Sequence, residues 1–273
     1  MRTPRILMCP PDFYGIEYEI NPWMNRSRGS SPELARGQWR SLYETLLGLG
    51  AAVELMVPQQ GLPDLVFTAN AGVVFGDRFY SSHFRHAVRA RESPHFDAWF
   101  ETHGFRVEHL PPETFFEGAG DALFCGKTLF AGYRIRSDVR GHQWLAAALK
   151  CQVLPLELVN PSFYHLDTCF CPLAPGVAIW YPDAFDFYGR KVIEANIPKL
   201  LAVEKEEAHR FACNAVVVGK TVVTNAGCPL LTAGLRHWGY TPVAVELGEF
   251  LKAGGSAKCL TLRLDGEESA VWE

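Results

Sequence analysis

The feature that most constrains the fold is a polar segment that recurs at intervals of 45 to 51 residues. Each polar segment leads into an apolar hairpin, and the hairpin turns contain glycine, as in Gly76-Asp77 and Gly219-Lys220. The segments are centred on Asn70, Asp121, Asp167, Asn214 and Cys259. A fixed period in this range indicates a propeller or a solenoid array.

The segments between the polar residues repeat the same order of elements. Four hairpins are expected, over 73–80, 122–130, 169–180 and 215–223. Helices that end near a glycine are expected at 33–47, 96–102 and 230–238, each followed by a strand, at 53–56, 105–110 and 241–247. Each module is therefore expected to run strand, strand, helix, strand.

The two ends of the chain complete the fifth module. We expect the strand at 5–8 to join a strand at 259–264 and so to close the modules into a ring. The expected fold is therefore α/β, a five-bladed propeller of ββαβ modules. No linker marks a boundary, so residues 1–273 are expected to form a single domain. A ring brings the polar segment of every module to one axis.

Composition excludes several classes of protein. A net charge of −4 gives no support for nucleic-acid or membrane binding, and the N-terminus lacks the apolar run of a signal peptide. Eight cysteines in such a chain indicate reduced thiols and a cytoplasmic location. The spacing of Cys169 and Cys171 is too tight for a zinc knuckle, so no metal is expected. The sequence does not determine the oligomeric state, and a homo-oligomer is possible.

The residues expected at the axis are typical of nucleophilic catalysis. Cys259 would be the nucleophile and His165 the acid and base, while Glu117 would orient the histidine or hold substrate nitrogens. Lys258 precedes the cysteine, and a neighbouring cation lowers a thiol pKa. The alternatives are a cysteine that merely begins a buried strand and a structural histidine. Asn70, Asp121 and Asp167 have an alternative as caps of hairpin turns.

The acidic residues around the expected nucleophile point to a cationic substrate. Carboxylates oppose formation of a thiolate unless a bound cation compensates them. A guanidinium fits best, because it is planar, always charged and forked toward carboxylates. Attack on its carbon would give a thiouronium on Cys259, which water activated by His165 would release. Asp167 would hold guanidinium nitrogens. No cofactor is needed for this chemistry.

Four motifs carry a resemblance to a known family. Phe67-Thr68-Ala69-Asn70-Ala71-Gly72, Phe116-Glu117-Gly118-Ala119-Gly120-Asp121, His165-Leu166-Asp167-Thr168 and Gly254-Gly255-Ser256-Ala257-Lys258-Cys259 resemble the guanidino-group-modifying enzymes, or penteins. Segments 7–12, 20–24 and 163–173 resemble the arginine dihydrolases of cyanobacterial type in particular. The resemblance implies hydrolysis of arginine to ornithine, ammonia and carbon dioxide. The bifunctional relatives carry a further C-terminal region, whose activity we expect this chain to lack.

The resemblance also implies roles for individual residues. It makes Cys259 the nucleophile, His165 the general acid and base, and Glu117 the carboxylate that orients His165. The substrate-binding candidates are Asp167 as guanidinium clamp, Arg89 and Arg136 for the α-carboxylate, Asn21 and Asn70 in the substrate site, and Asp121 at the axis. A small molecule, arginine or a related guanidino compound, is the expected partner.

One residue bears on the number of reaction steps and another on the substrate. Deiminases that resemble this chain carry aspartate where Asn70 stands, and an amide can hold both a cationic guanidinium and a neutral ureido group. We hypothesise that Asn70 allows citrulline to be attacked a second time. Asp167 argues for unmethylated arginine. The alternatives are an arginine deiminase, a dimethylargininase, an amidinotransferase and a non-catalytic binding pentein.

Overall fold

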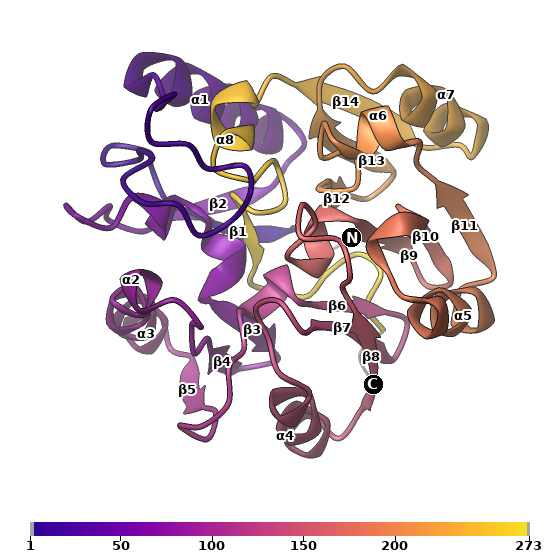
Figure 1. Ribbon diagram of the computed structural model, residues 1–273, viewed down its shortest axis with the longest axis horizontal. Coiled ribbons are helices and arrows are strands. Elements are labelled where there is room, and N and C mark those ends of the chain that lie inside the picture. Colours follow the sequence, from indigo (N-terminus) through magenta and orange to yellow (C-terminus); the bar gives the residue numbers. More distant parts are fainter. Residues whose placement is uncertain (1–2, 272–273) are drawn as a thin grey trace.

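Five three-stranded sheets surround a central axis in the computed structural model, which describes residues 3–271 (Figure 1). In each sheet two antiparallel strands are followed, after a helix, by a third strand parallel to its neighbour. The helical connection is what a parallel pair requires. This is the expected five-bladed α/β propeller of ββαβ modules.

Four modules lie in order along the chain. The first consists of β3 (Gly72–Phe75), β4 (Arg78–Ser81), α2 (Ala87–Ala90), α3 (Ser93–Thr102) and β5 (Arg106–His109). The second consists of β6 (Ala122–Cys125), β7 (Thr128–Tyr133), α4 (Val139–Leu149) and β8 (Gln152–Glu157). The third consists of β9 (Phe170–Ala174), β10 (Val177–Trp180), α5 (Phe187–Asn196) and β11 (Lys199–Ala202). The fourth consists of α6 (Lys205–Ala208), β12 (Val216–Val218), β13 (Thr221–Asn225), α7 (Pro229–His237) and β14 (Thr241–Val245).

The fifth module joins the two ends of the chain. It contains β1 (Arg5–Met8), α1 (Pro32–Gly48), β2 (Ala52–Leu55), α8 (Gly248–Leu251) and β15 (Leu262–Arg263). β15 pairs antiparallel with β1, with Leu7 opposite Leu262, and this pairing closes the ring as predicted. The predicted strand at 259–264 was too long. Residues 257–260 form turns instead, in which Leu260 N donates to Ser256 O and Thr261 N donates to Lys258 O.

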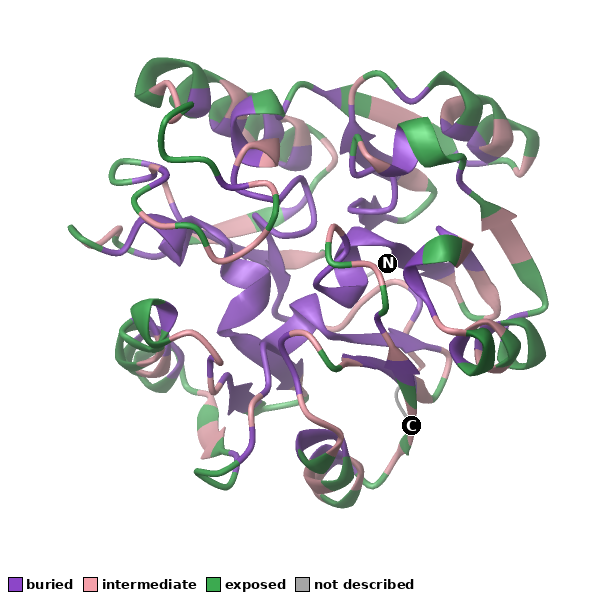
Figure 2. Cartoon of the chain, viewed as in Figure 1, coloured by how far each residue is buried: buried purple, intermediate pink, exposed green. Residues whose placement is uncertain are grey.

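The helices form an outer layer around the buried inner strands, and the third strand of each sheet is partly exposed (Figure 2). α1 shows how the sequence sets this arrangement. Its N-cap Ser31 accepts a hydrogen bond from Leu34 N, and Pro32 occupies the first turn. Its buried side chains recur at helical spacing, at Ala35, Trp39, Leu42 and Leu46. Within residues 3–271, no helix is long and apolar enough to span a bilayer.

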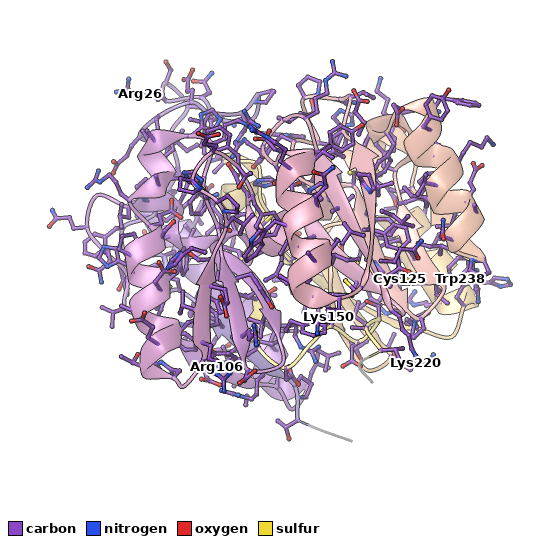
Figure 3. All side chains as sticks on the ribbon, turned by 90° about the horizontal axis from the view of Figure 1, so that it is seen from below. Arg26, Arg106, Cys125, Lys150, Lys220 and Trp238 are labelled. Atoms are coloured by element: carbon purple, nitrogen blue, oxygen red, sulfur yellow. The ribbon has the colours of Figure 1, made fainter. Side chains whose placement is uncertain are left out.

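The two ends of the central axis differ. At one end lies the loop 9–31, which has no helix or strand, and Arg26 of this loop marks that end in Figure 3. Arg106, Lys150 and Lys220 lie toward the opposite end, near the hairpin turns. A long irregular loop in a compact fold is typical of a functional segment. The two ends therefore offer different surfaces to a ligand.

Candidate active site

The polar segments of the five modules meet at the axis. Three of them form short 3-10 helices just before the first strand of a module: η2 (Thr68–Ala71), η3 (Gly118–Gly120) and η4 (Leu166–Thr168). Hydrogen bonds then join each module to the next around the ring. They are Asn70 Nδ2 to Glu117 O (3.5 Å), Leu166 N to Asp121 Oδ1 (3.0 Å), Asn214 Nδ2 to Asp167 O (3.0 Å), Cys259 N to Asn214 Oδ1 (3.1 Å) and Ala69 N to Cys259 O (3.2 Å).

Cys259 lies buried in a turn before β15. Its Sγ donates a hydrogen bond to Asp167 Oδ2 at 3.2 Å and accepts one from Asn214 Nδ2 at 3.1 Å. Burial raises the pKa of the Cys259 thiol well above its usual value, and the charge of Asp167 raises it further. The cysteine is therefore a thiol when no cation is bound.

Lys258 does not activate this thiol. Lys258 is buried, and its ammonium forms an ion pair with the partly buried Glu267. It is not among the residues that line the cavity containing Cys259. Its charge acts instead on Asp167, whose pKa burial raises to about 7 while Cys259 and Lys258 oppose the increase. Among residues 3–271, Asp167 Oδ1 has no hydrogen-bond donor. This buried oxygen is free to accept a donor from a ligand.

His165 and Glu117 form a buried hydrogen-bonded pair. His165 Nε2 lies 2.7 Å from Glu117 Oε2, and Arg136 Nη1 donates to the same oxygen at 2.9 Å. Burial alone would raise the pKa of Glu117, but Arg136 and His165 outweigh it and hold the pKa far below its usual range. Burial lowers the pKa of His165 to about 4. A neutral imidazole that donates from Nε2 keeps Nδ1 free as a base.

The two arginines predicted to bind a carboxylate differ in their remaining donors. Arg89 uses four of its five N–H groups on described residues: two on Glu92, one on Asn70 and one on Asp64 O. Arg136 uses two, on Glu117 Oε2 and Ile20 O. Its guanidinium also lies 4.5 Å from the centre of the Tyr164 ring. Arg136 therefore has more donors available for a ligand carboxylate.

The contacts of Asp121 differ from those expected of a substrate-binding residue. It is not among the lining residues of the cavity that contains Cys259. Its Oδ2 accepts from Ser137 Oγ at 2.6 Å, and its Oδ1 accepts from Leu166 N. Both oxygens are thus used within the protein, and they position the segment that follows His165.

Asn21 belongs to the loop 9–31, which covers the axis. Its Nδ2 donates to Ala253 O at 3.0 Å, and its Oδ1 accepts from Trp23 N at 2.9 Å. Tyr14 Oη donates to Glu249 O at 2.7 Å and holds the same loop against α8. Asn21 therefore connects the covering loop to the glycine segment before Cys259.

The cavity at this end of the axis is narrow, with about 10 Å³ of free space. It is lined by Ile20, Asn21, Met24, Asp64, Phe67, Asn70, Arg89, Arg136, Tyr164, Ala253, Gly254, Gly255 and Cys259. Five of the predicted site residues are in this set. His165, Glu117 and Asp167 are not. Glu117 and Asp167 are hydrogen-bonded to the lining residues Arg136 and Cys259, and His165 is hydrogen-bonded to Glu117.

Several residues of the site were not identified from the sequence. Asp64 lies in η1 (Pro63–Val66), between the modules and outside the repeat, and nothing in the pattern singles it out. Tyr164 donates from Oη to Gly254 O at 2.7 Å, and its position next to His165 was the only available signal. Asn214 was placed at the axis without a role, and the structure shows both ends of its amide bonded to Cys259.

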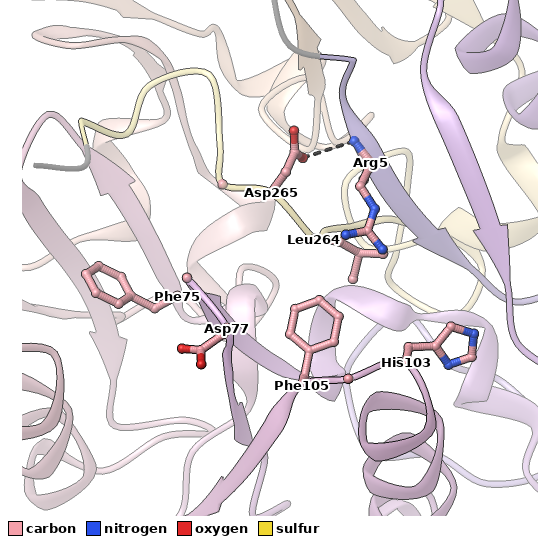
Figure 4. A pocket seen from close by; sticks show the side chains of 10 residues that line it. Arg5, Phe75, Asp77, His103, Phe105, Leu264 and Asp265 are labelled. Carbon is pink, nitrogen blue, oxygen red and sulfur yellow. Dashed lines mark hydrogen bonds between the residues drawn. The ribbon is translucent and has the colours of Figure 1, made fainter.

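A larger hollow of about 480 Å³ lies near the hairpin turns, between Phe75, Phe105 and Asp265 (Figure 4). Its charged groups already have partners: Asp265 accepts from Arg5 N at 3.0 Å and from Arg263 Nε at 3.0 Å. None of the predicted site residues lines it. The chemistry therefore belongs to the axial cavity. Within residues 3–271, no group of three His, Cys, Asp or Glu side chains could hold a metal ion.

Known proteins are similar to this chain in sequence. Residues 18–265 match the family model described as N,N dimethylarginine dimethylhydrolase, eukaryotic. The chain is 49% identical, over 95% of its length, to the bifunctional arginine dihydrolase/ornithine cyclodeaminase of Synechocystis sp., and it spans 37% of that relative. It is 40% identical to the N(G),N(G)-dimethylarginine dimethylaminohydrolase of Mycobacterium tuberculosis, over 96% of this chain and 86% of that one.

A solved structure gives the same relationship in three dimensions. The N-terminal domain of the Synechocystis-type enzyme ArgZ, an arginine dihydrolase crystallised with bound substrate, superposes with a TM-score of 0.94 at 48% identity. The match covers 97% of this chain and 99% of that domain. The chain therefore belongs to the guanidino-group-modifying family that contains the dimethylarginine dimethylhydrolases and the arginine dihydrolases.

Proposed function

We propose that this chain is an arginine dihydrolase that converts L-arginine and water to L-ornithine, ammonia and carbon dioxide. The observation that carries the proposal is the contact between Cys259 Sγ and Asp167, a buried carboxylate whose Oδ1 has no donor among the described residues. A guanidinium bound there would give Asp167 its missing donor and place its carbon beside the sulfur. The substrate cation would also offset the charge that keeps Cys259 protonated.

The first hydrolysis follows from this arrangement. With the guanidinium bound, Cys259 transfers its proton to His165 and the sulfur bonds to the guanidinium carbon. His165 returns the proton to a terminal nitrogen, which leaves as ammonia, and the carbon stays on sulfur as a thiouronium. Water then gives a proton to His165 Nδ1 and attacks the same carbon. The carbon–sulfur bond breaks, which yields citrulline and restores the thiol.

The second hydrolysis repeats these steps on the ureido group. Cys259 attacks the ureido carbon, ammonia leaves, and a carbamoyl group stays on sulfur. Water releases a carbamic acid, which loses carbon dioxide to give ornithine. Asn70, which lines the cavity, can donate to the ureido oxygen from its amide, whereas an aspartate would face that oxygen with a like charge.

We assign the remaining residues accordingly. Glu117 orients His165, Arg136 and Arg89 face the α-carboxylate, and Asn21 closes the amino-acid end of the cavity. Residues 1–273 are proposed to form one catalytic domain. The eight free cysteines support a reducing, cytoplasmic location.

Product analysis tests this function directly. The protein is incubated with L-arginine, and ammonia, citrulline and ornithine are quantified over time, with Cys259→Ala as the inactive control. Two ammonia molecules per ornithine support the proposal. Accumulation of citrulline with one ammonia would instead identify a deiminase.

A dimethylargininase is the second candidate, because the matched family model and the mycobacterial relative carry that name. Asp167 argues against it. A dimethylated nitrogen has no hydrogen to donate to a carboxylate oxygen, and its methyl groups would face buried charge. Release of dimethylamine from asymmetric dimethylarginine, with no turnover of arginine, would favour this second candidate.

A further inference from the structure

We propose that Glu92 is a positioning residue for the second hydrolysis, and that it acts through Arg89 to hold the amide of Asn70 with its NH₂ group toward the reacting carbon. This inference rests on the proposed dihydrolase function and extends it to two residues that do not themselves react. Glu92 lies just after α2, outside the repeated polar segments, and it is not among the lining residues of the cavity.

The first step is the clamp on Arg89. Glu92 Oε1 accepts from Arg89 Nε at 2.9 Å, and Glu92 Oε2 accepts from Arg89 Nη2 at 2.8 Å. Both side chains are buried, with 0% of Glu92 and 3% of Arg89 exposed. A two-point carboxylate contact fixes the plane of a guanidinium as well as its position. Arg89 therefore has one orientation in the cavity wall.

The second step is the orientation of the Asn70 amide. Arg89 Nη1 lies 2.8 Å from Asn70 Oδ1. Arginine has donors only, so the atom that faces it must be the amide oxygen. The other end of the amide faces the carbonyl oxygen of Glu117 at 3.5 Å, where only the nitrogen is compatible. Two neighbours of opposite character thus determine which end of Asn70 is the donor.

The third step locates that donor. A Cβ atom at Gly120 would lie 2.2 Å from Asn70 Nδ2 and 3.4 Å from His165 Cγ. Because both atoms lie close to the same point, the amide nitrogen of Asn70 lies near Cγ of the imidazole. It occupies space that only a glycine at position 120 leaves open. Asn70 presents a donor beside the proposed acid and base, in the cavity that also contains Cys259.

The chemical consequence concerns the neutral intermediate. A guanidinium offers only donors and its strongest partner is Asp167, whereas a ureido group also carries an oxygen that needs a donor. Without Glu92, the nearest carboxylate for Arg89 is Asp64, whose Oδ2 lies 3.8 Å from Arg89 Nε. If Arg89 turns to Asp64, Asn70 Oδ1 loses its donor and the amide is free to rotate. The second hydrolysis should then suffer more than the first.

The test is the product ratio of Glu92→Gln. With arginine as substrate, the fraction released as citrulline is expected to rise about tenfold or more over the wild type, while arginine is still consumed. Glu207→Gln is the matched control. Glu207 is also buried, and it accepts from Leu230 N and Leu231 N at the start of α7, away from the cavity. An unchanged ratio in Glu92→Gln, or an equal change in the control, would overturn the proposal.

A binding measurement separates this inference from the proposed function. In the Cys259→Ala background, calorimetry gives the affinities for citrulline and arginine with and without Glu92→Gln. Citrulline is expected to lose about tenfold more affinity than arginine. Equal losses contradict the role of Glu92, even if the wild type releases ornithine. A wild type that makes no ornithine contradicts the proposed function, and the binding ratio still tests the positioning.

A second variant covers the case in which an unpaired Arg89 prevents folding. Arg89→Met/Glu92→Gln removes both charges and the donor to Asn70 together, so no buried cation is left without a partner. The same selective loss of citrulline affinity is expected from it. Retention of the wild-type affinity ratio in this folded variant would contradict the proposal.

Discussion

Replacing Asp167 with asparagine should make the Cys259 thiol more acidic and at the same time make catalysis slower. Asp167 Oδ2 lies 3.2 Å from Cys259 Sγ, and its charge helps to raise the thiol pKa. Two like charges at this distance repel by roughly 5 kcal/mol at an effective dielectric constant of about 20. Asp167→Asn removes this repulsion, so the thiol pKa of the free protein should fall.

The same substitution removes the proposed partner of the guanidinium. Loss of one member of a buried charge pair costs about 2–5 kcal/mol, which corresponds to a decrease in kcat/KM for arginine of roughly 30- to 5,000-fold. The Asp167→Asn variant should therefore have a thiol that ionises more easily and a much lower kcat/KM. A model in which thiolate formation alone limits the rate predicts the reverse.

The assay follows inactivation by iodoacetamide as a function of pH, alongside steady-state turnover of arginine. The midpoint of the inactivation profile should shift to lower pH in Asp167→Asn. Asp64→Asn is the control, since Asp64 lines the cavity but has no hydrogen bond to Sγ. A midpoint that stays in place or rises would refute the electrostatic argument, and a decrease in kcat/KM below tenfold would refute the guanidinium contact.

Three further predictions follow. Gly120→Ala should lower kcat on the order of 100-fold, because its Cβ would lie 2.2 Å from Asn70 Nδ2, whereas Gly48→Ala, with nothing within 4 Å, should leave kcat unchanged. Burial lowers the pKa of His142 to about 4, so the unfolded state binds more protons and the wild type should lose up to roughly 3 kcal/mol from this residue as the pH falls from about 6.5 to 4. Urea unfolding at pH 7 and 4.5 should show a smaller loss for His142→Leu, and an equal loss would count against the assignment. Burial raises the pKa of Asp167 to about 7, so Asp167 can lose its charge opposite a neutral ureido group. Turnover of added citrulline relative to arginine should therefore decline as the pH rises through 7. A ratio that does not change with pH would contradict this.

The ring of modules could be predicted from the sequence because the patterns that indicate it are local. Turn glycines such as Gly76 and Gly219 both adopt a φ of about +60°, and the apolar stripe of α1 recurs at helical spacing. Such patterns repeat once per module and can be read without knowing the rest of the chain. The closure of β1 on β15 followed from counting modules.

Side-chain directions were less accessible, because they depend on contacts between modules. Asp121 shares the polar position with Asn70 and Asp167, yet its carboxylate holds Ser137 and Leu166 N. Arg89 was assigned to a carboxylate on the substrate, but the pattern did not indicate that Glu92, three residues later, would bind its Nε and Nη2. The period and the residue type predict that a side chain lies at the axis, but they do not predict which neighbours it forms hydrogen bonds with.

The hydrogen-bonded ring at the axis weakens the usual distinction between structural and catalytic polar residues. Asn214 binds the main chain of Cys259 with one end of its amide and the sulfur with the other. Asp121 bonds to the residue directly after His165. A displacement of either residue would move the nucleophile or the base without any contact with substrate. Since every module contributes one link, the spacing between Cys259 and His165 depends on all five modules, and precise positioning of reacting groups is a large part of catalytic power.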